Sequence, residues 1–215
     1  MNPASSGPVF VVLEGLDGSG KSTCAKALAA KLGAVLLATP AGELRHHRER
    51  LLAGFDGCQE AAQHLYQAAV FDASCRVRRL LDRGTSVVLD RYFLSTEAYA
   101  AFRGSKIRHD EQCSLLTPAD LTVFLHAPLA VRRERIQRRG VVTSADRETL
   151  TEAADAQLRH EHEVRSCLPV VGKFLSIDTS RADPSEVAER IVRILARERS
   201  IPAADPRDGA SSSAA

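Results

Sequence analysis

The sequence has no tryptophan and only one methionine, and its aromatic residues are limited to seven phenylalanines and three tyrosines. Hydrophobic residues still make up 44% of the 215 residues, so the chain can build a core, and that core must be largely aliphatic. No stretch approaches the roughly 18 consecutive apolar residues that a membrane-spanning helix requires. The formal net charge of +2 is too small to indicate binding to nucleic acid or to a membrane surface.

Cysteine is also scarce and scattered. The five cysteines form no C-x-x-C pair, which excludes a simple disulfide framework and a zinc ribbon. The N-terminal stretch MNPASSGP has no basic segment followed by an apolar one, so we expect no secretory signal. We therefore expect a reduced, cytoplasmic protein. Cys24, which lies one residue beyond a Ser-Thr pair, is expected to be a small buried helix residue.

Short apolar runs alternate with helix-forming stretches along the chain. Five runs are rich in valine, leucine and phenylalanine with little polar alternation, which is typical of strands buried on both faces of a parallel sheet. They span residues 8–15, 34–39, 86–92, 120–127 and, more weakly, 173–178. Helices are expected at 21–32, 44–53, 59–82, 94–102, 129–139, 147–166 and 184–198. The pattern predicts an α/β fold with a five-stranded parallel sheet flanked by helices.

The sequence predicts a single domain over residues 1–200 and a disordered tail over residues 201–215. No repeat or linker divides the domain, and the tail, IPAADPRDGASSSAA, has almost nothing to bury. The last helix has the clearest start, because Asp183 can cap it, Pro184 suits its first turn and Glu186 completes a capping box.

A phosphate-binding motif follows the first apolar run. The stretch GLDGSGKS, residues 15–22, fits G-x-x-x-x-G-K-[ST]. Glycine permits a positive φ, so that successive N–H groups point into one hollow at the start of the next helix. Lys21 is expected to bridge the transferred phosphate, and the Ser22 hydroxyl to ligate Mg²⁺. The residues expected to contact ATP are Gly15, Asp17, Gly18, Ser19, Gly20, Lys21, Ser22 and Thr23.

The third apolar run ends in Asp90-Arg91-Tyr92. In a parallel sheet, a carboxylate at the carboxyl end of a core strand lies beside the phosphate loop, where Asp90 can hold a metal-bound water. Arg91 can hold a second phosphate through a bidentate contact. The alternative interpretation is an ordinary surface Asp-Arg pair at the point where a strand ends.

Four stretches together resemble the thymidylate kinase family: EGLDGSGKST, then TPAGELR at 39–45, then DRYFLSTEAYA at 90–100, then RRG and DRE in the lid region at about 138–148. The resemblance covers about residues 8–195. It implies a P-loop kinase fold with a short arginine-rich lid. It also implies Mg²⁺-dependent transfer of the ATP γ-phosphate to a pyrimidine nucleoside monophosphate, with dTMP as the expected acceptor.

The resemblance assigns residues of the acceptor site one by one. Asp17 matches the loop carboxylate that faces the acceptor sugar and phosphate, and Arg45 and Arg91 match two arginines that hold the acceptor phosphate. Tyr99 matches an aromatic residue of the sugar pocket. Two of these have simpler alternatives, since Arg45 lies on a charged helix face and Tyr99 could be part of the core. The family commonly dimerises, and the helix at 59–82 could supply a homodimer interface.

The lid should provide the catalytic arginine. Residues 131–140, VRRERIQRRG, contain five arginines, and Arg147 follows. In this family the catalytic arginine lies either in the phosphate loop or in the lid, and here Gly18 follows Asp17. The candidates are Arg135, Arg138, Arg139 and Arg147, with Arg138, Arg139 and Arg147 expected to be catalytic, because guanidinium groups stabilise the charge that develops during phosphoryl transfer. Arg132 and Arg133 suit a solvated helix face.

The base-reading segment departs from the family pattern. Tyr66 takes the aromatic position, but Val70 takes the position of an arginine that grips the base, and Ala100 replaces a glutamine. A shifted alignment would use Arg76 instead. The segment LYQAAVFDAS is more similar to the mitochondrial UMP-CMP kinase branch of the family. UMP, CMP, dUMP or dCMP therefore remain alternative acceptors.

Two other classes of protein share the phosphate loop. A deoxynucleoside kinase needs a carboxylate base at the end of the second strand. Thr39-Pro40 stands there instead, although Glu43 keeps this alternative open. A non-enzymatic P-loop switch or pseudokinase is disfavoured because the N-K-x-D guanine motif is missing and Lys21, Ser22, Asp90 and Arg91 are all present.

Overall fold

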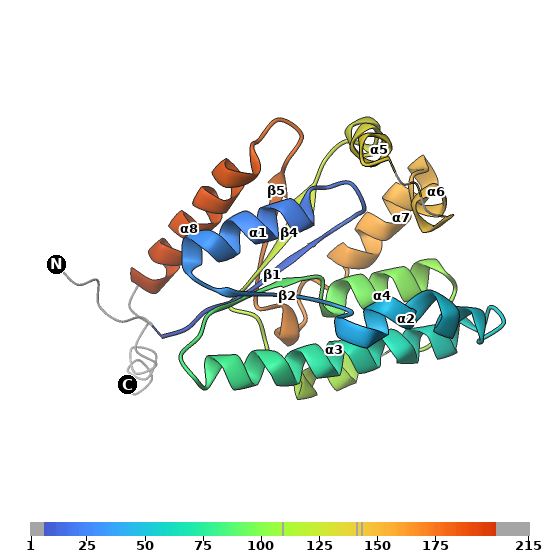
Figure 1. Ribbon diagram of the computed structural model, residues 1–215, viewed down its shortest axis with the longest axis horizontal. Helices are drawn as coiled ribbons and strands as arrows, with labels where there is room; N and C mark the ends of the chain where they lie inside the picture. Colours follow the sequence, from blue (N-terminus) through green and yellow to red (C-terminus); the bar gives the residue numbers. More distant parts are fainter. Residues whose placement is uncertain (1–6, 109, 141, 143, 201–215) are drawn as a thin grey trace, which may run out of the picture.

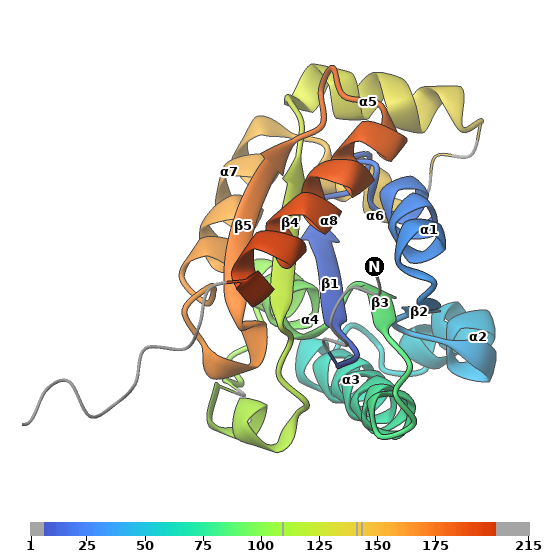
Figure 2. The same ribbon diagram turned by 90° about the vertical axis from the view of Figure 1, so that its left-hand side faces the viewer.

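The computed structural model describes residues 7–108, 110–140, 142 and 144–200. The predicted tail at 201–215 lies outside the described residues. A five-stranded parallel sheet forms the centre of the fold (Figures 1 and 2). Its strands lie in the order β2 (Val35–Ala38), β3 (Val87–Asp90), β1 (Phe10–Gly15), β4 (Leu121–His126) and β5 (Lys173–Asp178). The predicted α/β fold class is confirmed.

The helices cover both faces of the sheet. They are α1 (Lys21–Leu32), α2 (Gly42–Ala53), α3 (Gln59–Leu81), α4 (Phe93–Phe102), α5 (Leu129–Arg138), α6 (Ser144–Thr149), α7 (Glu152–Glu163) and α8 (Pro184–Ser200). Two short 3₁₀ turns, η1 (Asp110–Leu115) and η2 (Pro169–Val171), complete the described elements. Within the described part of the chain, none of the helices combines the length and the apolar character needed to cross a membrane.

The side chains of β1 alternate between two hydrophobic clusters. Val11 and Leu13 pack with α1 and α8, whereas Phe10 and Val12 pack with α3 and the start of α4. Figure 1 shows α1 and α8 on one side of the sheet and α3 and α4 on the other. Because both faces of β1 are covered, the strand is buried along its whole length.

The two edge strands differ from the prediction that all strands are buried on both faces. Val35 and Leu36 of β2 are 37% and 38% exposed, and β5 is buried fully only at Ile177. An edge strand has a neighbour on one side only, so fewer elements cover it. A continuous apolar run therefore identified these strands correctly but overestimated their burial.

One predicted helix is wrong. Residues 147–166 form parts of two helices, α6 and α7, which are separated at Thr151. The Thr151 hydroxyl accepts a hydrogen bond from the Ala154 N–H at 3.2 Å and so caps a new helix. The capping box of α8 is confirmed, because Asp183 accepts from the Ser185 N–H at 2.7 Å and Glu186 accepts from the Asp183 N–H at 3.2 Å.

Candidate active site

The predicted phosphate loop joins β1 to α1 at the carboxyl edge of the sheet. Gly15, Gly18 and Gly20 all have positive φ, and α1 begins at Lys21. At Gly18 the loop also needs the space, because a Cβ atom would lie 2.7 Å from the Arg132 carbonyl oxygen. The loop thus presents backbone N–H groups and the N-terminus of a 12-residue helix, which together bind an anion.

Lys21 lies within this loop and not in the core. Its ammonium donates to the Leu16 carbonyl oxygen at 2.8 Å, and the side chain is buried. Burial and, next, the positive charge of Arg91 lower the pKa of Lys21 to about 8, although Asp17 and Asp90 oppose the shift. Asp17 and Asp90 thus balance the positive charge of this ammonium only in part. A phosphate bound in the loop would supply the additional negative charge.

Ser22 and Asp90 meet as the sequence predicts. The Ser22 hydroxyl donates to Asp90 Oδ2 at 2.5 Å. The other carboxylate oxygen, Oδ1, is buried and has no hydrogen-bond partner among the described residues. Hydroxyl and carboxylate oxygens suit Mg²⁺, which usually takes few protein ligands and completes its shell with water and phosphate. The described residues contain no group of three or more His, Cys, Asp or Glu side chains that could hold a metal.

Asp17 links the loop to two residues of the DRYFLSTEAYA stretch. Its carboxylate is ion-paired with Arg91 and accepts a hydrogen bond from the Tyr99 hydroxyl at 3.0 Å. Burial alone would raise the pKa of Asp17, but Arg91 and then Lys21 lower it to about 2. Arg91 has φ of 70°, a left-handed conformation unusual for a residue with a side chain, and it stacks 5.3 Å from the Tyr99 ring centre.

Glu14 is a further residue of this site that the sequence analysis missed. It is the last side chain of β1 before Gly15 and is fully buried. Its carboxylate accepts hydrogen bonds from the Tyr92 and Ser95 N–H groups and from the Ser95 hydroxyl, so it caps the start of α4. Burial raises the pKa of Glu14 despite these hydrogen bonds. The sequence feature that could have revealed Glu14 is a charged residue at the end of an otherwise apolar strand.

A cleft of about 460 Å³ opens over the loop. Lys21 and Ser22 line it, together with Arg91, with Arg135 of α5 and with Arg139, the residue that follows α5. The Arg139 guanidinium also pairs with Asp146 of α6 at 2.7 Å. Of the three arginines that were expected to be catalytic, Arg139 is the one that lines the cleft.

The other two expected lid arginines lie in different surroundings. Arg138 is 74% exposed and pairs with Glu134 on its own helix at 2.5 Å. Arg147 is exposed on α6. Their catalytic roles therefore stay predictions, and the geometry favours Arg139 over both.

The other residues expected to bind the acceptor do not join the cluster formed by Asp17, Arg91 and Tyr99. Arg45 is exposed on α2, and Tyr66 is half-buried on α3. Val70 is fully buried and packs in the core cluster of Phe10 and Val12, so the structure does not support a direct acceptor contact for it. The alternative residue, Arg76, pairs with Asp72 on its own helix at 2.8 Å.

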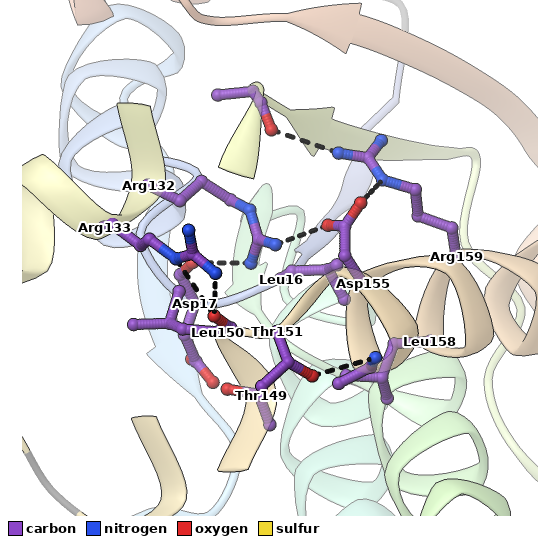
Figure 3. Close-up of polar contacts among 12 residues, drawn as sticks. Leu16, Asp17, Arg132, Arg133, Thr149, Leu150, Thr151, Asp155, Leu158 and Arg159 are labelled. Carbon is purple, nitrogen blue, oxygen red and sulfur yellow. Dashed lines mark hydrogen bonds and ion pairs between the residues drawn. The ribbon is translucent and has the colours of Figure 1, made fainter. Parts of the chain in front are cut away.

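The expectation that Arg132 is solvated is wrong. Its side chain is 0% exposed and lies between the phosphate loop and α7 (Figure 3). It donates to the Asp17 carbonyl oxygen at 3.1 Å and is ion-paired with Asp155. Arg133 is exposed, as expected, and donates to the Leu150 carbonyl oxygen at 2.9 Å.

The site can be compared with known proteins. A family model described as thymidylate kinase matches residues 13–191. The chain belongs to the thymidylate kinase family. A relative from Pyrococcus horikoshii, a probable thymidylate kinase, is 34% identical over 64% of this chain and 74% of its own length. The thymidylate kinase of Thermomicrobium roseum is 38% identical over 66% of this chain and 74% of its own length.

Other members of the thymidylate kinase family extend the comparison. The thymidylate kinase of Xylella fastidiosa strain M12 is 31% identical over 61% of this chain and 64% of its own length. The solved structure of the thymidylate kinase from Candida albicans superposes with a TM-score of 0.67, at 21% identity over 91% of this chain and 94% of that one. These findings confirm the predicted family, the P-loop kinase fold and the enzyme class, an ATP-dependent nucleoside monophosphate kinase.

Proposed function

We propose that this enzyme transfers the γ-phosphate of ATP to dTMP in a Mg²⁺-dependent reaction. The observation that carries the proposal is the position of Asp17, which belongs to the phosphate loop and yet binds Arg91 and Tyr99 of the acceptor motif. If these residues have the proposed roles, donor and acceptor would meet at one edge of the sheet. The names of the relatives support dTMP as the acceptor.

On the donor side, the backbone of residues 15–20 would hold the ATP phosphates and Lys21 would neutralise the transferred group. Ser22 and the unpartnered oxygen of Asp90 would hold Mg²⁺ through their oxygens. The ion, when bound, neutralises charge on the phosphate oxygens. Lys21 would turn from the Leu16 carbonyl oxygen toward the phosphate, so that its ammonium would pair with a negatively charged group.

On the acceptor side, Arg91 would hold the phosphate of the monophosphate, with Arg45 approaching from α2. Tyr99 would pack against the sugar, and Tyr66 against the base. Asp17 keeps Arg91 and Tyr99 in place. The attacking phosphate oxygen is already anionic, so the reaction needs no general base.

The lid would supply the positive charge between the two substrates. Arg139 lines the cleft and is held by Asp146, and Arg135 lines the same cleft one turn earlier on α5. We propose Arg139 as the principal arginine of the transition state. Arg138 and Arg147 could approach the cleft only if the lid moves, as lids of this kind do when they exclude water.

Base identity is the second part of the proposal. Val70 replaces a base-gripping arginine and is buried in the core, so this pocket would read the base mainly by shape. We propose that the enzyme prefers dTMP but discriminates against UMP, CMP, dUMP and dCMP less steeply than a thymidylate kinase with that arginine. We also propose a cytoplasmic location and a homodimer, as is common in the family.

A panel of acceptors tests the function. ADP release is measured at fixed Mg²⁺ and ATP with dTMP, dUMP, UMP, CMP, AMP, GMP and thymidine. The proposal expects the highest kcat/KM with dTMP and poor use of purine monophosphates, because a pocket sized for one ring excludes two. A higher kcat/KM for UMP or CMP would move the enzyme to the UMP-CMP type. Preference for thymidine would instead establish a deoxynucleoside kinase.

A further inference from the structure

Four successive carbonyl oxygens of the phosphate loop accept hydrogen bonds from side chains, three of which come from outside the loop. Lys21 donates to the Leu16 oxygen at 2.8 Å, Arg132 to the Asp17 oxygen at 3.1 Å and Arg135 to the Gly18 oxygen at 3.4 Å. The Thr179 hydroxyl donates to the Ser19 oxygen at 2.8 Å. A peptide whose carbonyl points outward turns its N–H inward, so the donors Arg132, Arg135 and Thr179 hold the direction of N–H groups that would bind phosphate.

Arg132 is the most deeply buried of the four donors, although Lys21 and Thr179 are also buried. It is the largest fully buried side chain among the described residues, and its main chain packs directly against Gly18. Burial of a guanidinium is costly unless it is paired and hydrogen-bonded. An apolar residue could fill the same volume without this cost. The presence of a buried arginine that faces the phosphate loop therefore suggests a role beyond packing.

Asp155 provides the compensating charge and ties the arginine to the surrounding fold (Figure 3). Its second oxygen accepts from Arg159 at 2.9 Å, and Arg159 also donates to the Ala127 carbonyl oxygen at 3.0 Å. The network therefore joins the loop, α5, α7 and the end of β4. It ties the Asp17 carbonyl oxygen to the sheet through Ala127, which directly follows β4.

We propose that Arg132 is a positioning residue of the phosphate loop: by holding the Asp17 main chain, it aims the loop N–H groups at the ATP phosphates and the Asp17 carboxylate at Arg91 and Tyr99. The inference rests on the proposed function, because it concerns the same donor and acceptor groups. Loss of Arg132 should loosen a loop that contains three glycines at positive φ, because the Asp17 carbonyl oxygen would lose its side-chain donor.

The test separates positioning from simple stability. The double variant R132M/D155L removes the buried ion pair but keeps apolar volume, and such replacements often preserve stability. The matched control is R165M, because Arg165 is also a buried arginine and pairs with Glu161 on α7 at 2.6 Å. Both variants and the wild type are compared for Tm, for kcat and KM, and for the Kd of a non-hydrolysable ATP analogue measured without turnover.

We expect R132M/D155L to stay folded, to lose about tenfold in kcat and to bind the ATP analogue more weakly, because small misplacements of reacting groups are expensive. R165M should keep the wild-type kcat at temperatures where it is folded. A folded double variant with wild-type kcat and analogue affinity would overturn the inference, and so would an equal loss in R165M.

A second variant, R132K, tests the inference if R132M/D155L does not fold. R132K keeps the positive charge but has one nitrogen where arginine has a fork, so it cannot hold Asp155 and the Asp17 carbonyl in the same geometry. A reduced kcat in R132K supports positioning, and an unchanged kcat contradicts it. If the wild type released no ADP with any acceptor, the proposed function would fail, while the analogue Kd would still decide the role of Arg132.

Discussion

His162 should make the stability of this enzyme fall below neutral pH. It is 1% exposed on α7, lies between the rings of Tyr99 and Phe124, and has its Nδ1 2.7 Å from the Leu158 carbonyl oxygen. The other ring nitrogen, Nε2, is buried without a hydrogen-bond partner among the described residues. Burial lowers the pKa of His162 to about 3, and the neighbouring positive charges of Arg91 and Lys21 act in the same direction, although the Leu158 carbonyl opposes them.

The sign of the effect follows from the protons bound. An unfolded histidine has a pKa of about 6.5, so between about pH 6.5 and pH 3 the unfolded state binds a proton that the folded state does not. The contribution of His162 is fully present above pH 6.5 and declines by about 1.4 kcal/mol for each pH unit below it. At pH 5 the loss relative to pH 7 is about 2 kcal/mol, or roughly 4–8 °C in Tm for a domain of this size.

The measurement is urea unfolding of the wild type and H162F from pH 7 to pH 5. Phenylalanine suits the aromatic surroundings and cannot titrate, so the variant should lose about 2 kcal/mol less than the wild type over this interval. The control is H160Q, which changes an exposed histidine on the same helix and should leave the wild-type dependence intact. Parallel pH curves for the wild type and H162F would refute the reasoning.

Three predictions concern activity. K21A should lower kcat at least a hundredfold while leaving the fold intact, because the ammonium lies in the loop; near wild-type kcat would contradict the mechanism. R139A should lower kcat at least tenfold, whereas R138A, which removes an exposed ion pair at the neighbouring position, should change it less than twofold; equal kcat values for the two variants would reject Arg139 as the principal lid arginine. Y99F, which loses the hydrogen bond to Asp17, should lower kcat/KM for dTMP about fivefold, and an unchanged kcat/KM would show that this contact is unimportant.

The sequence predicted the sheet and the conformation of the phosphate loop well because both depend on local patterns. The glycines and Lys21 form a contiguous motif that fixes the start of α1, and the strand at 173–178 was predicted at its observed bounds. The meeting of Ser22 and Asp90 follows from parallel strands, whose carboxyl ends share one edge of the sheet.

The remaining features depend on contacts between distant segments, which a local pattern does not contain. VRRERIQRRG reads as a solvated helix face, and only the approach of the loop and α7 buries Arg132 and supplies Asp155. Glu14 was missed for the same reason, since its partners lie about eighty positions further along the chain. Thr151 could have been recognised as a helix cap from its residue type alone.

The capping of α4 by Glu14 has a consequence for protein engineering. One way to alter acceptor preference is to exchange α4, the helix that carries Tyr99, for that of a relative. The start of α4 is held by a carboxylate from the strand that leads into the ATP loop. A grafted helix that lacks Ser95 would leave part of the buried Glu14 carboxylate unpaired and would disturb ATP binding as well as acceptor choice. Residue 14 and the helix should therefore be transplanted as one module.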